Sequence, residues 1–132
     1  MNIITQFLNF VYQKVIKKSS KTKDTGPERA YERLLKKQGL RMNKDYFKQC
    51  PVGRCHVDFY IKPWNTLVEV NGCYPHCCKK CGFNTESYGI PAKQKRLQDF
   101  RRMLFLQSQG YEVKVVWQHD LFKKKTQHQG GK

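Results

Sequence analysis

Acidic residues are scarce in this chain of 132 residues, in which ten Asp and Glu stand against 26 Lys and Arg. The resulting net charge of +16 favours a polyanionic partner, because each phosphate that a basic side chain neutralises releases condensed counterions. The balance indicates a phosphate-rich partner rather than any one activity, since ribosomal and architectural proteins share it. A ribosome- or RNA-associated protein is therefore one class that the composition leaves open.

Long apolar runs are also missing from the chain. No stretch of about 18 consecutive apolar residues is present, which argues against a membrane span. Residues 1–18 are too few and too polar to cross a bilayer, and they lack the basic start and small-residue cleavage site of a secretory signal. We therefore expect an intracellular protein that is not secreted and has no membrane partner.

Cysteine, by contrast, is abundant: the chain has six, and four of them lie between positions 73 and 81. Cysteines so close together cannot staple distant loops, and they indicate a metal site in a reducing compartment. Cys78 and Cys81 form a C-x2-C pair that presents two thiolates from one turn, and Cys73 adds a third. We predict a structural Zn²⁺ site whose best fourth ligand is His119. The rival fourth ligands are Cys50, Cys55, His76 and Cys77.

The length and a hydrophobic content of 39% suffice for one domain with its own core. We expect an appended helix over residues 1–20, a folded domain over 21–123 and a basic, disordered tail over 124–132. Within the domain the residue patterns predict a helix from about 26 to 38, a short strand near 46–47, a loop through 50–55, strands over 56–61 and 67–71, a helix over 91–109 and a strand over 111–117. This order predicts an α/β fold with a mixed central sheet flanked by helices.

The same patterns predict which side chains are buried. The helix over 26–38 is expected to bury Tyr31, Leu34 and Leu35. The strand over 56–61 alternates, with one face formed by Val57, Phe59 and Ile61 and the other by His56, Asp58 and Tyr60. The helix over 91–109 is expected to turn its apolar residues inward, namely Leu97, Phe100 and Leu104. Its basic residues are expected mostly outward, namely Lys93, Lys95, Arg101 and Arg102.

Asp58 and Glu69 are acids in the most apolar part of a basic chain. If their strands form a hairpin, both carboxylates can reach one hydrated Mg²⁺, which takes one or two protein carboxylates and keeps several waters. Such a cation supplies the charge stabilisation that phosphodiester hydrolysis needs. Asn71 shares the face of Glu69 and can hold a water or a phosphate oxygen. Because Asn cannot act as a base, that role falls to a hydroxide on the cation or to His76.

Each acid also has a simpler interpretation. On strands, acids are more often solvated residues of an exposed sheet face, and this alternative applies to Asp58 and Glu69. Asp99 lies on a predicted helix three residues from both Arg96 and Arg102, where a surface salt bridge is expected. Glu28 is first of all a favourable charge at a helix N-terminus.

Several short motifs occur in a characteristic order between Asp24 and about Leu121, roughly three quarters of the chain. They are a D-T-x-P-E helix start at 24–28, a G-L-R at 39–41, a P-D-F strand read as V-D-F at 57–59, an H-G-C-F-W-H read as N-G-C-Y-P-H at 71–76, an R-D read as Q-D at 98–99 and a closing V-W-E-C read as V-W-Q-H at 116–119. In order and spacing they resemble the very-short-patch mismatch-repair endonucleases and, more broadly, the PD-(D/E)XK nucleases.

The resemblance implies a restriction-endonuclease-like fold and a nuclease that acts on double-stranded DNA in mismatch repair. It implies that Asp58 is the principal Mg²⁺ ligand and that the active site also contains Glu28, His76 and Asp99. It assigns zinc to Cys73, Cys78, Cys81 and His119. It also implies that Tyr74 lies where the family inserts aromatic side chains into the base stack. Arg101 and Arg102 complete the expected DNA contacts.

The chain departs from the family pattern at four positions. Asn71 stands where the family has an active-site His, Pro75 where it has an intercalating Trp, and Gln98 where it has an Arg. Glu69 occupies a usually apolar position, and the resulting E-x-N is closer to the D…E-x-K arrangement of general PD-(D/E)XK nucleases. These departures favour a metal-dependent DNA endonuclease over a dedicated T:G mismatch nickase.

The leading hypothesis is therefore a Mg²⁺-dependent DNA endonuclease, nicking at mismatches or at specific sites in DNA repair. Its expected catalytic set is Glu28, Asp58, Glu69, Asn71, His76 and Asp99. Alternatives are a homing or restriction-type endonuclease and, in a different class, a catalytically inactive zinc-stabilised DNA-binding module, which Asn71 favours. We expect the protein on DNA in the cytoplasm or nucleoid. The residues do not give its oligomeric state, with a monomer slightly favoured.

Overall fold

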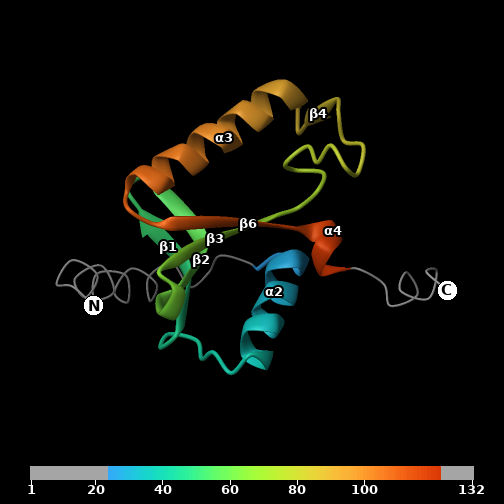
Figure 1. Cartoon of the computed structure of the whole chain (residues 1–132). Coiled ribbons are helices and arrows are strands. Elements are labelled where there is room, and N and C mark those ends of the chain that lie inside the picture. Colours follow the sequence, from blue (N-terminus) through green and yellow to red (C-terminus); the bar gives the residue numbers. More distant parts are fainter. Residues whose placement is uncertain (1–23, 123–132) are drawn as a thin grey trace.

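The computed structural model describes residues 24–122 (Figure 1). The helix predicted over 1–20 and the tail predicted over 124–132 lie outside these described residues. The elements are, in chain order, α2 (Gly26–Lys37), β1 (Tyr46–Val52), β2 (Cys55–Ile61), the short 3-10 helix η1 (Lys62–Trp64), β3 (Thr66–Asn71), β4 (Glu86–Ser87), β5 (Ile90–Pro91), α3 (Ala92–Ser108), β6 (Glu112–Trp117) and α4 (Gln118–Leu121).

One four-stranded sheet lies at the centre of the fold, with the strand order β1-β2-β3-β6. β1 pairs antiparallel with β2 and β2 antiparallel with β3, whereas β3 and β6 run parallel. Helix α3 lies over one face of this sheet and α2 over the other (Figure 1). The predicted α/β class, with a mixed central sheet and flanking helices, is confirmed.

Each face of the sheet has its own apolar core. Leu106 of α3 closes the cluster on one face, which also contains Phe47, Cys50, Val52, Val57, Tyr60 and Leu67. Tyr31 and Leu35 of α2 close the cluster on the other face, which also contains Tyr46, Phe59, Ile61, Val68 and Val70. A sheet covered on both faces buries both sets of alternating side chains, so its strands are apolar almost throughout.

Helix α2 begins and ends where its sequence predicts. Thr25 caps it: the Thr25 side chain accepts from the backbone N–H of Glu28, and the Glu28 carboxylate accepts from the backbone N–H of Thr25. This reciprocal capping box satisfies two donors that a helix start otherwise leaves unpaired. Tyr31 and Leu35 are buried as predicted, but the prediction for Leu34 is wrong, because its side chain is 46% exposed.

Strand β1 is longer than predicted, since it continues from Tyr46 through Pro51 to Val52, where a loop was expected. Proline is tolerated here because β1 is an edge strand of the sheet, where a missing N–H need not break a ladder. The predicted faces of β2 are also wrong. Val57 and Tyr60 pack on the α3 side, whereas Phe59 and Ile61 pack on the α2 side.

The reason for this change of face lies at Asp58 and at the residue opposite it. Gln49 has a left-handed φ of 53°, and the pairs on either side of it are Lys48↔Phe59 and Cys50↔Val57. A left-handed residue interrupts the regular alternation of a strand. The pairing of β2 with β3 also ends at Phe59, so Asp58 lies at the point where the two strands separate.

Helix α3 has the predicted extent but not the predicted orientation. Leu97, Phe100 and Leu104, expected to face inward, are each about half exposed, at 46%, 52% and 47%. The buried positions of the helix are Ala92 and Leu106. Across residues 24–122, no helix is both long enough and apolar enough to cross a bilayer.

Candidate metal centre and acidic cavity

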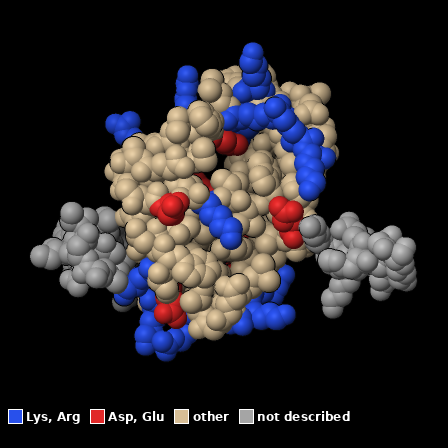
Figure 2. Space-filling view, in the orientation of Figure 1, with Lys and Arg blue, Asp and Glu red and all other residues tan. Residues whose placement is uncertain are grey.

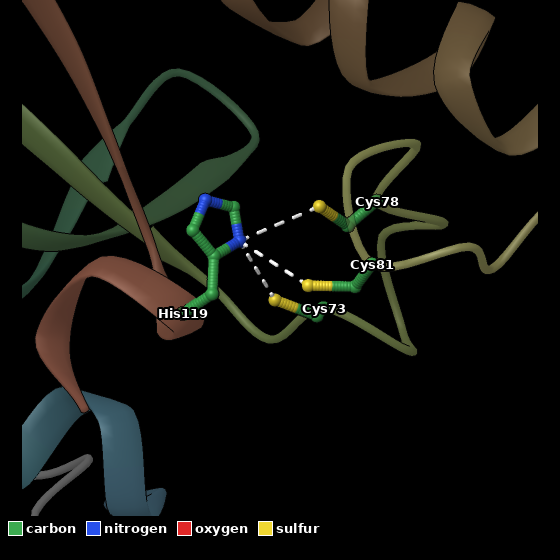
Figure 3. Close-up of side chains that lie close together, drawn as sticks. All are labelled: Cys73, Cys78, Cys81 and His119. Carbon is green, nitrogen blue, oxygen red and sulfur yellow. Dashed lines mark hydrogen bonds between the residues drawn. The ribbon is translucent and has the colours of Figure 1, made fainter. Parts of the chain in front are cut away.

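Three cysteines and one histidine converge on a single point beside the sheet (Figure 3). The ligand atoms of Cys73, Cys78, Cys81 and His119 all lie within 4.8 Å of one another. The Nδ1 atom of His119 lies 3.4 Å from the Sγ of Cys73, 3.6 Å from that of Cys78 and 3.4 Å from that of Cys81. Tetrahedral zinc, with bonds of about 2.3 Å to sulfur and 2.0 Å to nitrogen, separates the two atom types by about 3.5 Å. The cluster therefore has the composition and spacing to hold a structural metal ion such as zinc.

The sheet explains why ligands so far apart in the sequence meet. β3 and β6 run parallel with Asn71 opposite Trp117, so the loop that follows β3 and the short helix α4 that follows β6 leave the sheet side by side. Cys73 opens the loop, and its backbone N–H donates to the side-chain oxygen of Gln118 at 3.0 Å. His119 is the next residue, and its ring stacks on Trp117 with an interplanar angle of 7°.

The thiols of this cluster differ in protonation: burial opposes the charge on Cys78, but hydrogen bonds with Cys81 and its neighbours lower the pKa of that thiol. Burial raises the pKa of Cys73 to about 11, and the hydrogen bond with Cys81 and the neighbouring thiol charges add to this. Three thiolates cannot share such a small volume without a counter-charge, which a divalent ion supplies. Of the rival fourth ligands, Cys77 is buried but outside the cluster, and His76 is engaged elsewhere.

A cavity of about 960 Å³ opens next to the metal centre. Its walls come from the start of α2, from β2, β3 and β6, from the cysteine-rich loop, from α3 and from the start of α4. All six residues predicted as catalytic line it, namely Glu28, Asp58, Glu69, Asn71, His76 and Asp99. Figure 2 shows acidic side chains in a hollow that Lys and Arg side chains border on the upper right.

Asp58 is the acid with the most strongly altered protonation. One carboxylate oxygen accepts from the backbone N–H of Val70 at 2.7 Å, which holds the side chain between β2 and β3. Burial raises the pKa of Asp58 to about 8, and the charges of Glu28 and Glu69 and a hydrogen bond with Glu28 add to the effect. At neutral pH this carboxyl retains a proton unless a cation takes its place. Asp58 therefore has two acidic neighbours, Glu28 and the predicted Glu69.

Glu69 has a cationic partner that the sequence does not predict. The Arg102 guanidinium forms an ion pair with its carboxylate and also donates to the backbone carbonyl of His56 at 2.6 Å. Arg102 therefore points into the cavity, and its predicted outward orientation is wrong. Burial opposes the charge on Arg102, but the hydrogen bond with Glu69 outweighs it and raises the pKa of the guanidinium.

His76 and Asp99 form a second polar pair in the cavity. The Nδ1 atom of His76 lies 2.8 Å from the carboxylate of Asp99, and the Lys95 ammonium lies 3.3 Å from the same carboxylate. Burial opposes the charge on Asp99, yet the hydrogen bond with His76 and the charges around it lower its pKa. Asp99 does not form the surface salt bridge with Arg96 or Arg102 that its sequence allows. Arg96 instead donates to backbone carbonyls of the cysteine-rich region.

The acids of the cavity bring fewer ligand atoms close together than the Cys3His cluster does. Within the part of the chain that the structure describes, the Cys3His cluster is the one group of three or more His, Cys, Asp or Glu side chains whose ligand atoms gather so closely. A Mg²⁺ ion needs only one or two protein carboxylates, because waters and substrate complete its shell. Asp58 with either Glu28 or Glu69 meets that smaller requirement.

The predicted DNA contacts fall at different places. Tyr74 is half-buried, and its ring meets those of Phe83 and Tyr88 edge-on. Arg101 is exposed on α3, whereas Arg102 is committed to Glu69. Helical spacing alone separates these neighbouring arginines by about 100°, and only the orientation of α3 decides which of them enters the cavity.

No family model and no curated protein matches this chain.

Proposed function

We propose that this chain is a Mg²⁺-dependent DNA endonuclease of the PD-(D/E)XK type, similar to the very-short-patch mismatch-repair endonucleases, with a structural zinc ion at the Cys3His cluster. One observation carries the proposal. Six polar residues from five separate segments line a single cavity, and one of these segments, the loop after β3, also carries three of the four residues of the Cys3His cluster. In a chain of net charge +16, DNA is the polyanion that such a cavity would cleave.

Asp58 would hold the Mg²⁺ ion together with Glu28 or Glu69. The cation would neutralise charge that develops on the attacking and leaving oxygens of the phosphodiester. The raised pKa of Asp58 supports this role, because a carboxyl crowded by two other acids gains more from a divalent ion than an isolated one does. Asn71, which is 8% exposed at the end of β3, would hold a phosphate oxygen through its amide.

His76 would accept the proton of the attacking water. Its Nδ1 atom faces the Asp99 carboxylate, so the Nδ1–H donates there and the free Nε2 atom can act as a base. Asp99 also stabilises the imidazolium that forms when the proton arrives. Lys95 holds Asp99 from the preceding turn of α3 and keeps that carboxylate ionised.

Cleavage of supercoiled plasmid and of mismatched duplexes tests the proposal. Wild-type protein with Mg²⁺ should nick or cut the DNA, and Asp58→Asn should lower the rate by at least about 100-fold, since it removes the principal ligand without changing the shape of the side chain. Glu112→Gln is the matched control, because Glu112 is an exposed carboxylate of β6 outside the cavity. If the wild type cuts none of these substrates, or if Asp58→Asn cuts as well as the wild type, the chain is not this nuclease.

A second candidate function is a zinc-stabilised DNA-binding module without activity. The Glu69–Arg102 ion pair favours it, because the guanidinium occupies a carboxylate that the cation would otherwise use. Asn71, in the place of a possible base, favours it as well. This candidate predicts DNA binding with no cleavage under any divalent cation, and binding that Asp58→Asn leaves unchanged.

A further inference from the structure

The Glu69–Arg102 ion pair lies in the cavity, where its charges are partly shielded from water. The two side chains are 13% and 36% exposed, respectively. Removing two charges from water is costly, and well-packed apolar residues of similar size are often at least as stabilising as a buried ion pair. Stability of the fold therefore does not by itself explain why the pair stands in the cavity beside Asp58.

Two acceptors fix the orientation of the Arg102 guanidinium. Its Nε–H donates to the Glu69 carboxylate, and its Nη2 group donates to the backbone carbonyl of His56 at 2.6 Å. These acceptors belong to β3 and β2, beyond the last pair of those strands, Phe59↔Val68. A guanidinium has more donors than these contacts use, and within residues 24–122 the Nη1 group has no hydrogen-bond partner. This group remains available to a ligand in the cavity.

Asp58 interacts more strongly with Glu28 than with Glu69. Burial is the main reason that the pKa of Asp58 is raised, and the charge of Glu28 adds more to the effect than that of Glu69 does. A hydrogen bond also joins the Asp58 and Glu28 carboxyl groups. Two carboxyl groups that share a proton can share a cation in its place, whereas Glu69 already has a positive partner in Arg102. The favoured ligands of a cation are therefore Asp58 and Glu28.

The charges beside Asp58 fit a single divalent ion. Three carboxylates lie there, those of Glu28, Asp58 and Glu69, and the Arg102 guanidinium offsets one of them. One Mg²⁺ ion would balance the other two. A phosphate between this ion and the guanidinium would then meet positive charge on two sides, as a phosphate between two metal ions does.

We propose that Arg102 is a catalytic residue that donates from Nη1 to a non-bridging oxygen of the cleaved phosphate, and that Glu69 positions Arg102 and is not a Mg²⁺ ligand. The inference rests on the proposed endonuclease function and assigns the Mg²⁺ ion to Asp58 and Glu28. Donors that are already in place when charge develops stabilise the transition state without reorganisation. Arg102 loses no proton in this step, because a guanidinium stays protonated in proteins.

Binding of Mn²⁺ to the Zn²⁺-loaded protein without DNA, counted by electron paramagnetic resonance, tests the role of Glu69. The double variant Glu69→Gln/Arg102→Gln removes the ion pair without changing the net charge of the cavity, and it should bind Mn²⁺ as tightly as the wild type does. Glu28→Gln should weaken binding by at least about 10-fold, since changes to groups that merely orient a metal ligand already cost that much. A double variant that binds Mn²⁺ as weakly as Glu28→Gln would make Glu69 a ligand and overturn the inference.

Nicking of supercoiled plasmid, with protein and Mg²⁺ at saturation and well below the melting temperature of each variant, tests the role of Arg102. Arg102→Gln should lower the single-turnover rate by about 100- to 1000-fold, as the loss of one preorganised donor does. Arg102→Lys should also be slower than the wild type, because an ammonium keeps the charge but lacks the planar fork. Glu69→Gln should lose up to about 100-fold through misplacement of the guanidinium.

Arg33→Gln is the matched control, because Arg33 is an exposed arginine of α2 outside the cavity, and it should cut as the wild type does. If Arg102→Gln cuts at the wild-type rate or faster, Arg102 is not catalytic and the inference is wrong. Plasmid cleavage that depends on Asp58 would in that case leave the endonuclease proposal standing. Failure of the wild type to cleave any DNA would instead contradict the endonuclease proposal, and the inference with it.

Discussion

At the Cys3His cluster four ligand atoms lie within 4.8 Å of one another, whereas in the adjoining cavity each acid is held by a protein group. Arg102 holds Glu69, His76 and Lys95 hold Asp99, and the backbone N–H of Val70 holds Asp58. The sulfur site has the four ligands that a structural ion needs, and such an ion would balance thiolates that otherwise keep protons, as the raised pKa of Cys73 indicates. The oxygen site is already balanced by protons and basic side chains, which a cation and a phosphate can displace.

This contrast suits the two proposed tasks. A structural ion takes all its ligands from the protein, so those ligands must converge before the fold is stable. A catalytic cation shares its shell with water and substrate, so its carboxylates need only lie near each other.

Removal of the structural ion should have the largest effect. Structural zinc contributes about 10–16 kcal/mol of apparent binding free energy in small modules, as much as the whole stability of a typical domain. A strong chelator should release one equivalent of Zn²⁺ and abolish hydrogen-exchange protection over residues 72–91 and in α4. Cys78→Ala should bind no Zn²⁺, while the matched Cys77→Ala should still bind one. Zinc retained by Cys78→Ala would disprove the ligand set.

Asp58 should make the Mg²⁺-free domain less stable as the pH rises. Its folded pKa of about 8 lies above the unfolded value of about 3.9, so between these values the folded state binds more protons than the unfolded state. Stability is therefore full at low pH and declines between about pH 4 and 8, by an amount on the order of a few kcal/mol. Urea unfolding at pH 5 and pH 8 measures the decline.

Asp58→Asn should remove most of this pH dependence, because the amide has no proton to lose, and Glu112→Gln should leave it intact. Saturating Mg²⁺ should restore the stability of the wild type at pH 8 but not that of Asp58→Asn. If the stability of the wild type and that of Asp58→Asn depend on pH in the same way, Asp58 is not the acid whose pKa is raised.

Arg102→Gln should have a moderate effect. The substitution leaves the Glu69 carboxylate, which is 13% exposed, without its cation, and a loss of about 1–3 kcal/mol in the free energy of unfolding is expected. Arg101→Gln is the matched control on the exposed side of the same helix, where a change within about 0.5 kcal/mol is expected. Denaturant unfolding of both variants gives the comparison, and equal losses would mean that Arg102 has no special partner.

Thr25→Ala should have the smallest effect. It removes the side-chain oxygen that accepts from the Glu28 backbone, at a cost of about 1 kcal/mol. Because Glu28 also lines the cavity, the same variant should reduce Mg²⁺ affinity if Glu28 is a ligand. Thr85→Ala, at an exposed position before β4, is the control for both measurements. If Thr25→Ala is as stable as the wild type and binds Mg²⁺ with the same affinity, the result would contradict a role for Glu28 as a ligand.

The sequence predicts much of this architecture because its local signals are strong. The capping residues Thr25 and Glu28 mark the start of α2, and the apolar strands around Asp58 and Glu69 appear with nearly correct ends. The C-x2-C spacing gives Cys78 and Cys81, the nearby Cys73 adds a third residue, and His119, the predicted fourth, joins them in the cluster. Strand β1 continues through Pro51 to Val52, where the sequence predicts a loop, because an edge strand tolerates proline.

The orientation of α3 could not be predicted, and the reason is physical. Hydrophobic periodicity finds the inner face of a helix only if the interior is apolar. Here the inner face of α3 lines the cavity with the charged residues Lys95, Asp99 and Arg102 among apolar ones such as Phe100, and Leu97 and Leu104 are about half exposed. Conflict between pattern and structure is expected at functional sites, where chemistry sets the residues instead of packing.

The parallel pairing of β3 with β6 has a consequence for how the protein is made. Three metal ligands lie within nine residues of one another, but His119 follows Cys81 by 38 positions. During synthesis the ion can be partly held by the first three thiolates, while complete coordination waits until β6 has joined the sheet. Pairing of the edge strand β6 with β3 and closure of the metal shell would thus be one event, and a bound ion could exchange more easily before it.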